Sequence, residues 1–380
     1  MAENTPATVS PGQLATADQY NAIVGFFNNY GVASYTSDPA APNPGQVWYN
    51  STEGNFKIFA PVLTLSETFT AATGHDRVFA LVYDGTYIYA GYDTTPGIVD
   101  QIVPSTMTLN KTFTAPTGHN MVDSLAYDGT YLYAGYGVSP GIVDQITPST
   151  MTLNKTFTAA TGHNKVFALA YDGTYIYAGY GTSPGIVDQI VPSTMTLNKT
   201  FTAATGHNEL FVLVYGAPYI YAGYYNTAPG IVDQITPSTM TLNKTFTAAT
   251  GHNGLDALTY DGTYIYAGYS VNPGIVDQIT PSTMTLNKTF TAPSGQDAVF
   301  ALAYDGTYLY AGYGTSPGIV DQILPSTMTL NKTFTAATGH NHTYALVYGA
   351  PYIYAGYSVN APGVVDQLVK KPSIGIISTH

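Results

Sequence analysis

TFTAATGHNKVFALAYDGTYIYAGYGTSPGIVDQIVPSTMTLNK, residues 156–199, is the stretch that decides the fold of this chain. Near-identical copies follow one another to the end of the sequence, each opened by TFTAATGH or a close variant of it. The opening runs begin at Thr68, Thr112, Thr156, Thr200, Thr245, Thr289 and Thr333. They are 44 residues apart, with one interval of 45. A period of this size with strand-like and turn-like composition is the sequence signature of a β-propeller blade.

Each copy contains four short runs that are typical of β-strands. In the third copy they span residues 166–171, 175–180, 185–190 and 196–201, and they are rich in Val, Ile, Tyr, Phe and Thr. Asp172-Gly173, between the first two runs, favours a tight hairpin turn because glycine adopts a positive φ at little steric cost. No apolar pattern of period 3.6 occurs inside the repeats, which excludes a parallel β-α-β architecture. We letter the four strands A to D, from the innermost to the outermost.

The two ends of the repeat array complement each other. The seventh copy stops after its C strand, residues 363–368, and has no D strand of its own. A segment that matches a D strand, residues 63–69, precedes the first A strand. Pairing these two segments would close the ring and leave no exposed terminal blade. The sequence therefore predicts an all-β, seven-bladed propeller of four-stranded antiparallel blades, in which an N-terminal strand completes the last blade.

The composition excludes several classes of protein. Only 9% of the 380 residues are charged and the net charge is −12, so binding of nucleic acid through its phosphates is not expected. The chain has no cysteine, and hence no disulfide or thiolate metal site. Residues 1–30 carry no signal-peptide pattern, and no apolar run is long enough for membrane insertion. A surface rich in Thr, Ser, Asn, Gly and Tyr suits a protein that works outside cells.

The region before the repeats is expected to form a separate attachment region. Residues 17–30 predict a short amphipathic helix that opens with a capping-box pattern, and residues 46–59 predict a β-hairpin. The candidate attachment residues are Tyr20, Ile23, Val24, Phe27, Trp48 and Tyr49. The expected organisation is an N-terminal segment with the helix (1–36), a linker and hairpin (37–61), the propeller (62–369) and a C-terminal tail (370–380). One helix and one hairpin are too small to be stable alone and need a docking partner.

Two short segments of this region carry a resemblance. Residues 13–21, QLATADQYN, and residues 44–50, PGQVWYN, resemble segments near the start of tailed-phage and other viral fibre or tail proteins. The resemblance implies a virion or extracellular surface location. It also implies that residues 1–61 bind other virion proteins or further copies of this chain, while the distal domain meets a host cell-surface glycan or protein.

The repeats carry a second resemblance, to seven-bladed propellers of the NHL and YVTN surface-protein kind. The Gly-His pair between strands D and A is also similar to the corresponding turn of WD40 blades. The Trp-Asp ending of WD40 blades is missing, however, and no Asp recurs between strands B and C. We therefore do not expect the WD40 hydrogen-bond network.

Differences between the seven copies gather in the D-to-A and B-to-C connections. Chain direction alternates along a blade, so both connections should lie on one face of the propeller, which we call the varied face. Loops on a rigid scaffold commonly carry binding, but relaxed drift gives the same pattern, and the sequence leaves both explanations open. The candidate ligand-binding residues are Asp76, Arg77, Asp93, Asp123, Asn164, Lys165, Asn208, Glu209, Tyr225, Asn226, Asp256 and His342.

Asp123 and Asp256 stand where the other copies have Phe or Tyr. A buried carboxylate is unfavourable, so we expect them at a solvated strand end, with ligand contact as the alternative. A second recurrent feature is a histidine at the end of the D-to-A run, with Gln296 in its place in the sixth copy. Adjacent blades pack about 10 Å apart, whereas zinc ligands lie at about 2 Å. We therefore expect these histidines to stabilise turns and expect no metal, cofactor or catalytic residue.

Three functions remain open on the sequence. The first is a non-enzymatic adhesin of the tail-fibre kind, anchored by its N-terminus and binding a host receptor through the varied face. The second is a purely structural virion component that serves as a spacer or decoration. The third is a glycan-active propeller enzyme, which is disfavoured because no charged cluster breaks the repeat.

Overall fold

The computed structural model describes residues 33–35, 37, 47–50, 52, 55–59, 62–358, 361–371 and 374–377. Contacts divide the chain into two compact units, one of residues 1–64 and 370–380 and one of residues 65–369. Every regular element in the described residues is a strand. The helix predicted over residues 17–30, with Tyr20, Ile23, Val24 and Phe27, lies outside them. None of the described segments is a helix of the length and apolar character needed to cross a bilayer.

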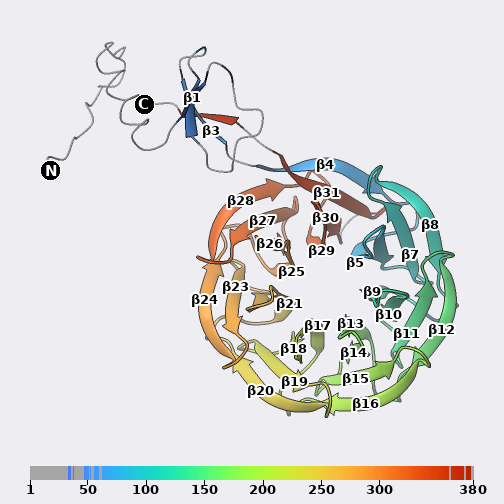
Figure 1. Ribbon diagram of the computed structural model, residues 1–380. Coiled ribbons are helices and arrows are strands. Elements are labelled where there is room, and N and C mark those ends of the chain that lie inside the picture. Colours follow the sequence, from blue (N-terminus) through green and yellow to red (C-terminus); the bar gives the residue numbers. More distant parts are fainter. Residues whose placement is uncertain are drawn as a thin grey trace. The chain divides into compact units, whose positions relative to one another are not determined.

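The larger unit consists of seven four-stranded antiparallel sheets arranged around a central axis (Figure 1), which confirms the predicted seven-bladed all-β propeller. Blades one to three contain β5 (Val78–Tyr83), β6 (Ile88–Tyr92), β7 (Ile98–Val103), β8 (Thr108–Thr114), β9 (Val122–Tyr127), β10 (Leu132–Tyr136), β11 (Ile142–Thr147), β12 (Thr152–Thr158), β13 (Val166–Tyr171), β14 (Ile176–Tyr180), β15 (Ile186–Val191) and β16 (Thr196–Thr202).

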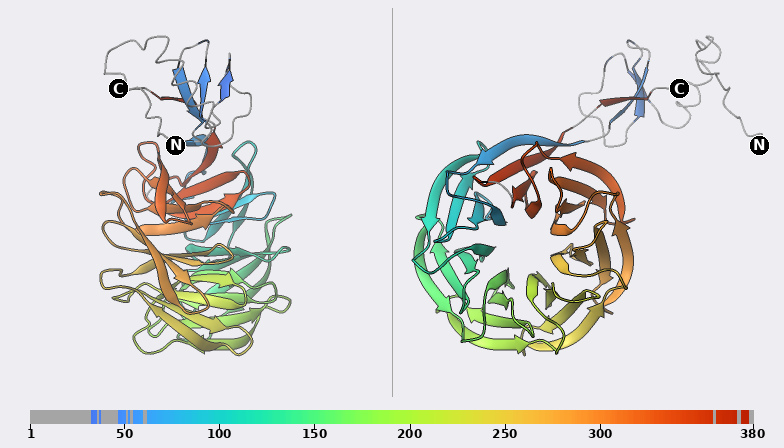
Figure 2. Two further views of the ribbon diagram at one scale, coloured as in Figure 1. Left: turned by 60° about the vertical axis from the view of Figure 1, so that its left-hand side comes forward. Right: turned by 180° about the vertical axis from the view of Figure 1, so that it is seen from behind.

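Blades four to six repeat the same order of strands from the axis outward. They contain β17 (Leu210–Gly216), β18 (Tyr219–Tyr224), β19 (Ile231–Thr236), β20 (Thr241–Thr247), β21 (Leu255–Tyr260), β22 (Ile265–Tyr269), β23 (Ile275–Thr280), β24 (Thr285–Thr291), β25 (Val299–Tyr304), β26 (Leu309–Tyr313), β27 (Ile319–Leu324) and β28 (Thr329–Thr335). The innermost strand of each blade faces the axis in the view from behind (Figure 2).

The seventh blade is built from both ends of the repeat array. Its strands are β29 (Thr343–Gly349), β30 (Tyr352–Tyr357), β31 (Val364–Lys371) and β4 (Val62–Thr70), in that order. The Thr68 hydroxyl donates to Asp366 Oδ1 at 2.7 Å, tying β4 to β31. The Gly363 amide donates to the His75 carbonyl of blade one at 2.7 Å. The predicted closure of the ring by an N-terminal strand is therefore confirmed.

Close packing between blades explains the uniform sequence of the B strands. Tyr89 and Tyr92 of β6 are fully buried, so each contributes a large apolar surface to the contact between blades. Gly91 lies between them, and a Cβ atom there would stand 2.6 Å from Cγ1 of Val122 in the next blade. Only glycine lets the two sheets approach this closely. The same Tyr-Ala-Gly-Tyr run recurs in every blade because every junction needs it.

Polar side chains link consecutive blades at the face opposite the varied face. Gln101 donates to the Tyr89 hydroxyl at 2.9 Å and to the Pro148 carbonyl of the next blade at 3.1 Å. Gln367 makes the corresponding bond to the Pro104 carbonyl at 2.8 Å, across the seam where the ring closes. A buried amide that donates to a hydroxyl of its own blade and to a carbonyl of the next blade fixes the relative orientation of the two blades. This face is therefore rigid and nearly identical from blade to blade.

The smaller unit contains one sheet with the strand order β1-β2-β3-β32. Its strands are β1 (Ala33–Tyr35), β2 (Val47–Asn50), β3 (Asn55–Phe59) and β32 (Ile374–Ile377). The antiparallel pair β2–β3 is the hairpin predicted from the sequence, and Trp48 and Tyr49 lie in β2. β32 pairs antiparallel with β3. A strand contributed by the C-terminal segment was not anticipated from the sequence.

Candidate functional site

A β-bulge in the innermost strand of every blade turns one side chain toward the axis. In blade two, Val122 pairs with Tyr136 and Ser124 with Gly135, so Asp123 between them has no partner in the ladder. Bulges of this kind re-aim a side chain and are frequent near functional sites. The seven bulge residues are Phe79, Asp123, Phe167, Phe211, Asp256, Phe300 and Tyr344. We call them the bulge ring.

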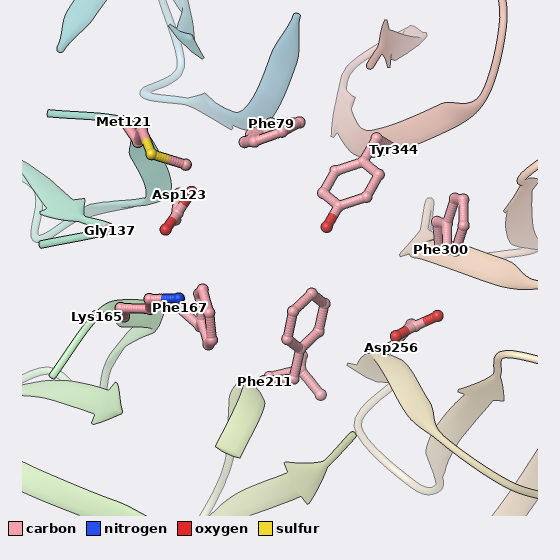
Figure 3. A pocket seen from close by; sticks show the side chains of 11 residues that line it. Phe79, Met121, Asp123, Gly137, Lys165, Phe167, Phe211, Asp256, Phe300 and Tyr344 are labelled. Carbon is pink, nitrogen blue, oxygen red and sulfur yellow. The ribbon is translucent and has the colours of Figure 1, made fainter. Parts of the chain in front are cut away.

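The bulge ring lines a cavity of about 330 Å³ at the centre of the propeller (Figure 3). Met121, Gly137, Lys165 and Val212 complete its wall. Small-molecule sites occupy about 300–1,000 Å³, so this cavity is large enough for a small ligand or for one residue of a larger one. The candidate site is therefore a feature of the whole ring, to which all seven blades contribute.

The aromatic side chains of the ring form two groups that the two carboxylates separate. Tyr344 stacks with Phe79 and with Phe300, with ring centroids 4.9 and 5.3 Å apart. Phe167 and Phe211 form the other group, with centroids 5.3 Å apart. Asp123 belongs to blade two and Asp256 to blade five, and Figure 3 shows them on opposite sides of the cavity. Aromatic and acidic surfaces thus alternate around the opening.

Both carboxylates are held in an environment that disfavours their charge. Asp256 is 6% exposed, and burial raises its pKa to about 7, against a smaller opposing effect of a hydrogen bond from Ser270. Burial also raises the pKa of Asp123 to about 7, helped by the charge of Asp93 and opposed by that of Lys165. Oδ2 of each carboxylate is buried and has no hydrogen-bond partner among the described residues. The expectation of a solvated strand end is therefore wrong for Asp256, which is buried, whereas Asp123 is half-buried; the bulge turns both side chains into the cavity.

Tyr344 adds a hydrogen-bond donor to the same cavity. Figure 3 shows its hydroxyl directed inward. Burial raises the pKa of Tyr344, and the charges of Asp256 and Asp123 raise it further. The phenol therefore stays protonated at neutral pH and can donate a hydrogen bond to a ligand.

The residue just before each A strand stands on the varied face in a left-handed backbone conformation, and we call these seven positions the rim. The φ values are 55° for Arg77, 60° for Met121, 56° for Lys165, 54° for Glu209, 61° for Gly254, 49° for Ala298 and 56° for His342. This conformation costs a residue other than glycine about 1–2 kcal/mol. Drift under selection for stability alone would favour glycine or asparagine at these positions. Large and chemically diverse side chains at five of them favour a role for the side chains themselves.

A belt of backbone hydrogen bonds holds the rim in place. The Met121 amide donates to the Thr94 carbonyl of blade one at 2.9 Å, and the Gly137 amide donates to the Met121 carbonyl at 3.0 Å. The Lys165 amide then donates to the Val138 carbonyl at 2.8 Å, and the pattern continues around the ring. The D-to-A and B-to-C connections therefore do share one face, and varied side chains stand there on a fixed backbone.

Three of the residues singled out from the sequence, Asp123, Lys165 and Asp256, line the cavity. The Nζ atom of Lys165 lies 5.9 Å from the centroid of the Phe167 ring. Arg77 and Asp93 form an exposed ion pair at the rim, with Nη1 and Oδ2 3.0 Å apart.

Two more of the predicted residues support the ring from outside the cavity. Tyr225 stacks on Phe211 with centroids 5.5 Å apart, and His342 lies 6.3 Å from Phe300. The others stand on turns of the varied face and do not line the cavity: Asp76, Asn164, Asn208, Glu209 and Asn226.

The aromatic members of the bulge ring were not recognised from the sequence as site residues. They occupy the same repeat position as Asp123, and that position was noticed only where a carboxylate replaced the aromatic side chain. The bulge that directs them inward depends on backbone pairing, which composition does not reveal. A repeat position that is aromatic in five copies and acidic in two was the available signal.

The recurrent histidines form a separate, structural network. His75 Nδ1 lies 2.8 Å from Oδ2 of Asp100, a fully buried residue of the C strand, and the Thr112 hydroxyl donates to Oδ1 of the same carboxylate at 2.6 Å. The histidine therefore does more than stabilise the D-to-A turn: through Asp100 it links the turn to strands C and D of the blade. The carboxylate that pairs with the histidine thus comes from the C strand, since no aspartate recurs between strands B and C. Nowhere in the described part of the chain do three His, Cys, Asp or Glu side chains gather as metal ligands.

The sixth blade shows what the histidine contributes. Gln296 stands in its place and reaches Oδ1 of Asp321 at 3.4 Å. Burial raises the pKa of Asp321, opposed by hydrogen bonds from Thr333, Tyr313 and Gln296. An amide at this distance compensates the buried carboxylate less well than an imidazole at hydrogen-bond distance.

No protein-family model matches this sequence, and no curated protein matches it at a significant level. The resemblances to NHL and YVTN propellers and to viral fibre proteins therefore rest on the motifs quoted above.

Proposed function

We propose that this protein is a non-enzymatic adhesin whose propeller binds a host surface glycan or protein through the varied face. The observation that carries this proposal is the bulge ring. Asp123 and Asp256 depart there from an otherwise aromatic ring, and both line one central cavity. A buried, unpaired carboxylate destabilises a folded protein, so its presence at the cavity favours a contribution to ligand binding.

The rim supports the same proposal. Its side chains differ from blade to blade, while their backbone is fixed by the hydrogen-bond belt. A preformed backbone reduces the conformational entropy lost on binding. The exposed Tyr225 and the ion pair between Arg77 and Asp93 offer stacking and hydrogen-bonding groups, which suit a sugar or a polar protein surface.

We propose binding rather than catalysis because of how the acidic groups lie. The two carboxylates come from blades two and five and face the cavity from opposite sides (Figure 3). The rest of the wall is mainly aromatic, which offers packing surface to a bound ligand. The attachment half of the proposal rests on the tail-fibre-like segments at residues 13–21 and 44–50, through which residues 1–61 would join a particle.

The proposal is tested by measuring binding of the full chain to a glycan array and to host cells. The double variant Arg77→Ala/Tyr225→Ala removes two side chains of the varied face, and Ser193→Ala, on the opposite face, serves as the matched control. We expect saturable binding that falls at least tenfold in the double variant and is unchanged in the control. Absence of binding, with the propeller ordered inside a particle, would support a spacer instead. Turnover of a bound glycan would support an enzyme.

A further inference from the structure

The chemistry of the central cavity is complementary to a positive charge. Two carboxylates line it, and only one ammonium group, that of Lys165, lies among the lining side chains. Asp256 is 6% exposed, and its Oδ2 has no hydrogen-bond partner among the described residues. An ionised carboxylate in such a place is stable only when a cation or several hydrogen-bond donors compensate it.

The remaining wall favours one kind of cation over others. Phe79, Phe167, Phe211, Phe300 and Tyr344 contribute aromatic rings. The face of an aromatic ring attracts an organic cation that lies within about 6 Å of its centroid, and several rings around one site recognise ammonium groups. A metal ion, in contrast, needs several oxygen or nitrogen ligands at short distance. Aromatic walls with two opposed carboxylates therefore fit an ammonium group.

We propose that the central cavity binds an organic cation, with its ammonium group between Asp123 and Asp256 and against the aromatic side chains of the bulge ring. This inference rests on the proposed role of the varied face in binding, and it specifies the chemical class that the face recognises. The ammonium group belongs to a small molecule or to a substituent of a larger surface component.

Lys165 shows that the cavity accommodates such a group. Its Nζ atom lies 5.9 Å from the centroid of the Phe167 ring, and its charge acts on Asp123. Figure 3 shows this nitrogen directed toward the cavity beside Phe167. The side chain is exposed and long enough to swing outward. It therefore acts as a tethered competitor, which a ligand ammonium displaces from Phe167.

The test is a calorimetric titration of the full chain with choline at about pH 8. The neutral carbon analogue 3,3-dimethylbutanol, which has the same shape without the charge, is titrated in parallel. We expect one saturable site for choline and at least tenfold weaker binding of the analogue. Glucosamine and an Nα-acetylated lysine amide, titrated in the same way, identify which source of the ammonium group the cavity prefers.

Three variants and one control make the result specific. Asp123→Asn and Asp256→Asn preserve shape, remove a charge, and are each expected to weaken choline binding at least tenfold. Lys165→Met removes the tethered competitor and is expected to strengthen binding severalfold, a gain that damage to the fold cannot produce. Asp297→Asn removes a carboxylate from the same face outside the cavity and is expected to leave affinity unchanged.

Two results would overturn the inference. The first is the absence of saturable choline binding in both the wild type and Lys165→Met. The second is equal binding of choline and its neutral analogue. If ammonium ions fail to bind while the glycan array still shows binding that depends on the rim, the inference fails and the proposed function stands. Absence of binding in every assay removes both.

Discussion

Replacing Asp256 by asparagine should stabilise the protein, and increasingly so as the pH rises. In the folded protein this carboxyl has a pKa of about 7, against 3.8 for the free group, because it is buried. The folded state therefore keeps a proton that the unfolded chain has already lost. The free energy of unfolding falls as the pH rises from about 3.8 to about 7 and then levels off. Asparagine does not titrate, so the free energy of unfolding of the variant does not fall for this reason.

The size of the effect follows from the two pKa values. One unit of pKa difference corresponds to about 1.4 kcal/mol, so the roughly two units between pH 5 and the folded pKa correspond to about 3 kcal/mol. The neighbours that respond to this carboxyl are Ser270, which donates a hydrogen bond to it, and Tyr344, whose pKa it raises. Asparagine keeps an acceptor for Ser270, so the hydrogen bond is retained.

The assay is urea unfolding of the wild type and of Asp256→Asn at several values between about pH 5 and pH 8, followed by near-ultraviolet circular dichroism. The difference between the two proteins cancels the titration of all other groups. We expect the advantage of the variant to grow by about 3 kcal/mol over this range. A difference that is constant with pH, or that shrinks as the pH rises, would refute the assignment of a buried carboxylate at this position.

Three further predictions concern the scaffold. Gln296→His should restore the imidazole link of the sixth blade, lower the pKa of Asp321 and raise the free energy of unfolding by about 1–2 kcal/mol in thermal unfolding experiments. Gln367→Ala removes the side-chain bond across the ring-closing seam and should cost about 1–3 kcal/mol. In hydrogen exchange it should expose the amides of β4, unlike Gln189→Ala at an internal junction. Gly91→Ala places a methyl group against the next blade and should cost about 1–3 kcal/mol in urea unfolding.

The architecture was readable from the sequence because strand-like runs recur from copy to copy, and the number of copies fixes the number of blades. Asp-Gly turns mark the first hairpin in five copies, and the unpaired D-strand segment at residues 63–69 indicates how the ring closes. The hydrogen bonds from Gly363 to His75 and from Thr68 to Asp366 confirm that the two ends of the repeat array meet in the last blade.

The cavity was only partly readable. Comparison between copies drew attention to Asp123 and Asp256, but their burial depends on a bulge that a linear pattern does not encode. Phe79 and its equivalents were not singled out, because an aromatic side chain in a strand has the same sequence appearance whether it faces a neighbouring blade or the axis. The strand β32 was missed for a related reason: Ile374–Ile377 is a short apolar run whose partner, β3, lies more than 300 residues away.

The most direct test of the central claim compares choline binding by the wild type with binding by the double variant Asp123→Phe/Asp256→Phe, which gives the bulge ring the aromatic residue found in most other blades. If the two departures from the repeat create the binding site, the wild type binds choline at one saturable site, and the double variant folds but binds at least a hundredfold more weakly. Equal affinity in the two proteins would contradict the claim.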